Sequence, residues 1–268
     1  MNWTTGATPV VFNQLQMWTN MAINQDAVPT GASPYVWTST WNPAVFPTVE
    51  HRTLERRITD GTNHDDDEFL WATAQSLQLN YQQGDVLMMN CSGFAGGRTN
   101  STLTAGQALP TINTNPSTLS KVWIDSTWAN LGTTVVAAQV LSWDFSFTNG
   151  LRPLMSADAR TDFTVDVLND NDTAIDFTMD VLVDTNAAQY SIEQTAAEAL
   201  TLRAIRVEVV GAGNSDLTIS FLAKHVQGSM YEISEQDGLT VVRMTFQESH
   251  DGTNFLETVL TNDQATNV

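Results

Sequence analysis

The chain has 268 residues, with 30 acidic against 11 basic side chains and a formal charge of −19. Its hydrophobic content of 42%, with eight Trp and eleven Phe, is sufficient for a core and excludes an acidic disordered chain. The only lysines are Lys121 and Lys224, and the longest basic run is Arg56-Arg57. This balance argues against a protein that binds DNA tightly by neutralising its phosphates.

The cysteine content and the hydropathy of the sequence exclude several further classes of protein. The single cysteine, Cys91, excludes an internal disulfide framework and a Cys-rich zinc site. No run approaches the roughly 18 apolar residues of a membrane-spanning helix. The first residues lack the basic and then apolar regions of a secretory signal, so none is expected.

Residues 1–68 are predicted to form an N-terminal arm and long loop. A short helix is expected at 13–23, and prolines break 24–68 into extended pieces. Because aromatic rings are costly to leave in water, this segment is expected to pack on something, such as a neighbouring subunit. Its candidates for that contact are Tyr35, Trp37, Trp41 and Phe46.

Within residues 69–268, several segments alternate apolar and polar side chains, which predicts β-strands. A hairpin is expected at 76–91, then a loop at 95–120. Further strands are expected at 121–125, 143–148 with a turn at 149–150, 175–183, 205–211, 217–221, 239–247 and 255–260. One helix is expected at about 192–203, with Ser191 as its N-cap and Arg203 in its last turn.

These elements predict a mainly β fold, an antiparallel β-sandwich or barrel with one flanking helix and long loops. The residues from 69 onward are taken as one domain. Two fused half-folds, about 69–120 and 121–268, are an open alternative.

No motif predicts catalysis, and no cofactor or metal is expected. The cluster at 64–68 and the one at 169–172 are interpreted as solvated loops, because adjacent polar residues cannot all point at one ion. Gly211-Ala212-Gly213 is followed by a strand, so no helix N-terminus is available for a pyrophosphate. Cys91 is interpreted as a buried small hydrophobe, since none of the four histidines lies in a supporting motif.

Eight aspartates fall between residues 158 and 184. Asp176, Asp180 and Asp184 lie on the polar side of the strand expected at 175–183. A solvent-facing side of a sheet accounts for this pattern. If copies of the strand closed into a ring, the same aspartates would line a negative channel that repels phosphates, but spacing alone does not establish oligomerisation.

Residues 119–262 resemble the major tail tube protein of long-tailed bacterial or archaeal viruses. The resemblance rests on the order and spacing of Val122-Trp123-Ile124-Asp125, Leu131-Gly132-Thr133-Thr134, the stretch from Ser142 to Pro153, the expected helix with its following strand, and the closing segments. It implies a β-sandwich with a flanking helix, stacked as rings into a hollow tube in the virion tail.

The resemblance also implies a conduit through which viral DNA passes without specific binding, with no catalytic residues. The implied partners are other copies of the chain, as trimers or hexamers, and other tail proteins.

Two alternatives stay open. The chain could be another virion subunit, such as a tail terminator or capsid-decoration protein. It could also be a carbohydrate-binding β-sandwich that stacks Trp37, Trp41 or Trp128 on sugar rings.

Overall fold

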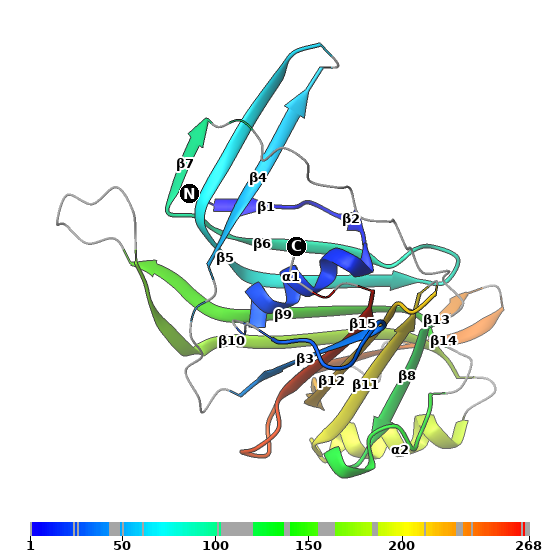
Figure 1. The fold of residues 1–268 in the computed structure, drawn as a ribbon. Coiled ribbons are helices and arrows are strands. Elements are labelled where there is room, and N and C mark those ends of the chain that lie inside the picture. Colours follow the sequence, from blue (N-terminus) through cyan, green and yellow to red (C-terminus); the bar gives the residue numbers. More distant parts are fainter. Residues whose placement is uncertain are drawn as a thin grey trace.

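Antiparallel strands dominate the chain, as the alternating sequence predicts (Figure 1). The structure is a computed structural model that describes residues 2–23, 25, 27–42, 49, 51–60, 62–100, 102, 120–136, 140–154, 164–183, 187–211, 213–228, 233–236, 238–263 and 265. Within these residues there are 15 strands and two α-helices. The prediction of a mainly β, antiparallel fold is therefore confirmed.

The elements follow the chain in this order: β1 (Asn2–Thr4), β2 (Thr8–Pro9), α1 (Phe12–Ile23), β3 (Tyr35–Trp41), β4 (Arg52–Thr59), β5 (His64–Gln82), β6 (Met88–Phe94), β7 (Gly97–Asn100), β8 (Ser120–Asp125), the 3-10 helix η2 (Trp128–Asn130), β9 (Val140–Leu154), β10 (Thr164–Leu182), α2 (Ala187–Glu198), β11 (Arg203–Val210), β12 (Asp216–His225), β13 (Ile233–Gln236), β14 (Leu239–Glu248) and β15 (Leu256–Asn262).

The strands form two groups that meet at β12. The first leaf has the order β1-β6-β5-β9-β10-β14, and the second leaf has the order β8-β11-β12-β15-β3. The first half of β12 pairs with β15, from Asp216↔Thr261 to Phe221↔Leu256. Its last residues pair instead with β14, from Ala223↔Glu248 to His225↔Phe246. The sheet is therefore continuous from one leaf into the other.

The hydrophobic core lies between the two leaves. Phe145 and Phe177 of the first leaf approach Phe221 of the second, with ring centroids 5.5 and 5.3 Å apart. Such aromatic contacts add to the free energy gained by removing the rings from water. Helix α1 inserts its apolar side into the same core through Phe12, Leu15 and other buried residues.

The expected boundary at residue 68/69 falls inside one continuous strand. β5 runs from His64 to Gln82, and the core includes α1 and β3 from before that point. The helix expected at 13–23 is confirmed as α1. The long loop expected at 24–68 is wrong in part, because it contains β3, β4 and the start of β5.

A three-stranded ribbon projects from the body (Figure 1). It consists of β4, the first half of β5 and β7, and is called the ribbon below. The cluster at 64–68, expected as a solvated loop, is part of it. Asp66 pairs with Arg57, and the fully buried Asp67 pairs with Arg56 and Arg98, so charges on neighbouring strands make the acidic strand possible.

Other predictions are wrong in detail. The segment 169–172, expected as a solvated loop, lies within β10, and the loop expected at 95–120 contains β7. The turn expected at 149–150 lies within β9, where the Asn149 amide donates to the carbonyls of Ala22 and Ala74, both at 2.8 Å. Helix α2 spans Ala187–Glu198 rather than 192–203. It ends before Leu200, whose φ of 49° is left-handed, and Arg203 is the first residue of β11.

Helix α2 is fastened to the second leaf by a buried ionic cluster. Glu193 is fully buried and pairs with Arg203, and its second oxygen lies 3.0 Å from His225 Nε2. A buried carboxylate is tolerated only when it is paired in this way. The cluster therefore fixes the position of α2 on the sheet.

We expect Glu193→Gln to lower the free energy of unfolding by about 3–5 kcal/mol, because it leaves the buried Arg203 without its counter-charge. The measurement is urea unfolding of both proteins. Glu198→Gln, on an exposed position of the same helix, serves as the control and should change stability by less than about 0.5 kcal/mol. Equal effects of the two substitutions would contradict this account.

Candidate functional site

The outer side of the first leaf is a continuous polar face built by the strand pleat. Residues on this side alternate with the buried Trp143, Phe145, Phe147, Phe177 and Met179. One row crosses five strands as Asn90–Gln78–Ser146–Asp176–Gln247, and the next crosses four as Asn80–Asp144–Thr178–Thr245. This surface, completed by the row Gln82–Ser142–Asp180–Arg243, is called the polar face below.

The aspartates of the polar face are held by their neighbours to different extents. Asp144 accepts hydrogen bonds from the amides of Gln78 and Asn80 on β5. Asp180 receives two bonds from Arg243, at 2.9 and 3.1 Å, and one from the Ser142 hydroxyl at 3.0 Å. Asp176 is exposed. The face thus presents small hydroxyls, amides and fixed carboxylates.

The hydrogen bonds from Arg243 lower the pKa of Asp180 below its ordinary value of 3.8. Partial burial opposes this shift, and the hydroxyl of Ser142 adds a smaller lowering. Asp180 is therefore ionised at neutral pH. With Asp144 and Asp176, it gives the polar face three carboxylates against the guanidinium of Arg243 and the ammonium of Lys224, which lies beside Gln247 at the end of the first row. A surface of this charge attracts cations and water and repels phosphate groups.

The structure brings together two of the three aspartates expected to share a face. Asp176 and Asp180 lie on the same side of β10, whose residues Ile175, Phe177 and Met179 are buried on the other. Asp184 lies outside the described residues. Asp144 was not among the predicted residues, although the alternation at 143–147 would have placed it on the same side.

Most of the described aromatic residues that were expected to contact another subunit pack instead against the core of their own chain. Trp37 and Trp41 are 2% and 3% exposed in the core, and the Trp37 indole donates to Asn262 at 3.1 Å. Tyr35 is half-buried beside that core, and Phe46 lies outside the described residues. Burial also keeps Trp37 and Trp41 from stacking on a sugar. Contact with a neighbouring subunit stays a prediction for this segment, but Trp37 and Trp41 no longer require it, because both are already removed from water within the chain.

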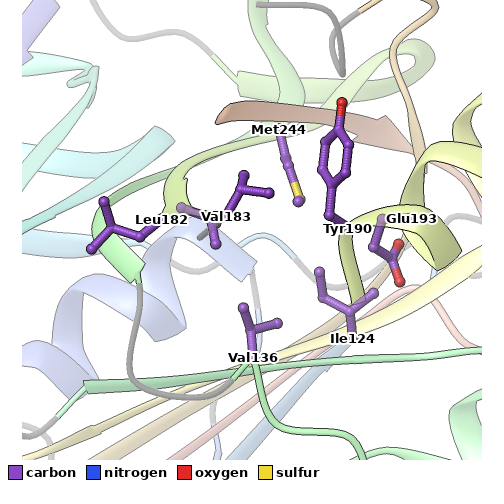
Figure 2. A pocket seen from close by; sticks show the side chains of 8 residues that line it. Ile124, Val136, Leu182, Val183, Tyr190, Glu193 and Met244 are labelled. Carbon is purple, nitrogen blue, oxygen red and sulfur yellow. The ribbon is translucent and has the colours of Figure 1, made fainter. Parts of the chain in front are cut away.

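Figure 2 shows a pocket beneath α2, where Tyr190 and Glu193 face Ile124, Val136 and Met244. Its volume is about 10 Å³, close to the room for one water molecule. A cavity of this volume corresponds to a small packing defect and is too small for a substrate.

Sequence reasoning missed the ionic cluster of the ribbon. Its signal was present, because Arg56-Arg57 and Asp66-Asp67 match in reverse order, as antiparallel partners do. Cys91 is buried as expected, and burial raises the pKa of its thiol well above the ordinary range. Among the described residues no group of three or more His, Cys, Asp or Glu side chains is placed to hold a metal ion.

Comparison of the chain with models of known protein families found no match, and no curated protein was significantly similar to it. In the part of the chain that the structure describes, neither helix has the length and apolar character needed to span a membrane.

We expect Arg243→Gln to lower stability by less than about 1 kcal/mol at pH 7, because the pair with Asp180 is partly exposed. Since the folded state lowers the pKa of Asp180, the pair stabilises the fold above pH 3.8 and this contribution is lost as the pH falls. The substitution should therefore reduce the loss of stability between pH 5 and pH 3 in urea unfolding.

Lys224→Gln, at the exposed end of the same face, is the control and should leave the pH dependence unchanged. An unaltered acid dependence in Arg243→Gln would show that the ion pair does not hold Asp180.

Proposed function

We propose that the chain is a structural subunit of a viral tail tube, which polymerises as stacked rings around a channel for DNA. In this proposal the polar face lines the channel. The observation that carries it is the face itself, a wide, regular surface of small polar groups with two held carboxylates and a third, exposed one, over a sheet whose other side is mostly apolar.

The chemistry of the polar face suits a wall past which DNA slides. Proteins that hold DNA neutralise its phosphates with Lys and Arg, and those contacts strengthen as salt falls. Here the only guanidinium of the three rows donates to Asp180 from two of its three nitrogens. The hydroxyl and amide groups keep water at the surface, and Lys224, beside Gln247 at the end of the first row, adds a single ammonium that the carboxylates outnumber.

The strands at the margins of the second leaf, β3 and β8, supply the means of assembly. Among the described residues their outer edges are covered in part, by Thr30 against Val36 of β3 and by Val135 against Trp123 of β8, and the remaining length can pair with another subunit. Unpaired edges in a monomer are liable to aggregate, whereas pairing with the next subunit turns the same edges into specific contacts. Localisation in the virion tail, and contacts with other tail proteins, belong to the same proposal.

We expect the purified full-length protein to form rings or hollow tubes in negative-stain electron microscopy. Sedimentation at several concentrations and ionic strengths measures the same assembly in solution. Isolated rings without tubes would favour a tail terminator, and a monomer under all these conditions would contradict the proposal.

We expect the substitution pair Asp144→Lys and Asp176→Lys to leave assembly intact and to make the assembled particles retain DNA, because cations would then face its phosphates. The measurement is salt-dependent co-sedimentation of short duplex DNA with intact tubes.

The matched control changes the same charge elsewhere, with Glu198→Lys on α2 and Glu257→Lys on the outer side of β15. It should retain less DNA within the tubes than the polar-face pair. Equal retention by the two variants would remove the polar face from the channel.

A further inference from the structure

The ribbon joins the body of the molecule at one level of β5, where this strand changes partners. Leu70 pairs with β7 of the ribbon, whereas Thr73 pairs with β6 of the body. Between them, Leu70 and Trp71 of β5 lie opposite the single residue Thr53 of β4. Two residues against one form a β-bulge, which bends a strand. In Figure 1, β5 turns out of the body and into the ribbon.

Trp71, within this bulge, has a left-handed backbone with a φ of 55°. A residue with a large side chain rarely adopts this region, because its Cβ comes too close to a neighbouring carbonyl oxygen. Such a residue keeps the conformation only where its surroundings hold it, and switch regions are among the places where this occurs. The bend of β5 therefore stores strain that an extended conformation of Trp71 would release.

His51, directly before β4, is the neighbour that holds Trp71. The two ring centroids lie 5.7 Å apart with the ring planes at 75°, and the imidazole donates a hydrogen bond to the backbone carbonyl of Trp71. The indole itself is 60% exposed, so burial in the core does not fix it. His51 is therefore a positioning residue for the bend.

The contact between His51 and Trp71 favours the neutral imidazole. Burial lowers the pKa of His51 below its ordinary value of 6.5, although the hydrogen bond to Trp71 acts in the opposite direction. Among the described residues no charged side chain contributes to this shift, that of the adjacent Arg52 included, and Nδ1 is buried without a hydrogen bond. The contact is therefore fully stabilising above pH 6.5 and weakens as the pH falls below that value.

We propose that His51 and Trp71 form a pH-sensitive clamp, which holds the ribbon at its angle to the body at neutral pH and releases it in mild acid. On release the protonated imidazole moves into water, Trp71 becomes extended and β5 straightens. The ribbon moves as a unit, because hydrogen bonds from Arg56 and Arg98 lower the pKa of Asp67 and keep these ion pairs intact in mild acid. This device does not depend on assembly into a tube.

The first test measures the length of β5 from end to end in the full chain. Thr62→Cys near the tip of the ribbon and Gln83→Cys just beyond the other end of β5 are exposed positions for two spin labels, and the native Cys91 is buried. Double electron–electron resonance should give a narrow distance distribution at about pH 7.5 and a broader one, shifted to longer distances, at about pH 5.5. Identical distributions at the two pH values would overturn the inference.

Substitutions of His51 test its place in the clamp. His51→Gln keeps a hydrogen-bond donor but cannot gain a proton, so it should keep the short distance at both pH values. His51→Ala should show the long distance at both. His250→Gln, which changes an exposed histidine, is the matched control and should respond to acid as the wild type does. An acid response that survives in His51→Gln would overturn the inference.

Trp71→Asn tests the stored strain. Asparagine adopts the left-handed region more readily than tryptophan, so this variant should keep the short distance in acid because little strain remains to be released. A wild-type response of Trp71→Asn to acid would contradict the clamp.

A label pair within the body, Gln83→Cys with Thr253→Cys, should keep one distance at both pH values, since both exposed positions lie outside the ribbon. Equal lengthening of this pair in acid would also overturn the inference, because the whole fold and not the ribbon would then respond. Circular dichroism checks that all variants fold.

Discussion

The structure depends on the division of each long strand into a buried and a solvated side. On β10, Ile175, Phe177 and Met179 are buried while Asp176 is exposed. A shift of one residue in the pairing of β9 with β10 would bring aspartates into the core and expose phenylalanines. The hydrophobic core therefore fixes the register, and the register in turn aligns the polar residues of five strands into rows. The polar face is a consequence of how the core packs.

The ionic groups serve different purposes in different parts of the molecule. The buried cluster of Glu193, Arg203 and His225 holds a helix against the sheet. In the ribbon, Asp67 joins β4 and β7 to β5 through two arginines. The carboxylates of the polar face instead remain at the surface. The acidity of the chain is thus compatible with a stable fold because Arg56, Arg98 and Arg203 neutralise the carboxylates that are themselves buried.

Strands with a clear two-residue period were predictable from the sequence. The alternation around 143–148 and 175–183 gives β9 and β10, although both strands extend beyond those limits. Charged segments were not predictable in the same way, because the conformation of Asp66-Asp67 depends on arginines about ten and thirty residues away in the chain. The end of α2 was predicted too far along the chain because Arg203 was assigned to the last turn of the helix. In the structure Arg203 begins β11 and pairs with Glu193 of the helix from there. For the candidate site, Asp176 and Asp180 were predicted from periodicity, but the rows that join them to Ser142 and Arg243 depend on the pairing of distant strands and leave no local pattern.

The most direct test of the account asks whether the polar face is enclosed in the assembled protein. Ser146 lies at the centre of that face. Because the native Cys91 is buried, Ser146→Cys provides one accessible thiol. In intact tubes the account predicts labelling by a small maleimide and exclusion of a maleimide attached to a large polymer, with Glu198→Cys labelled by both. Equal labelling of Ser146→Cys by the two reagents in assembled particles would contradict an enclosed channel wall.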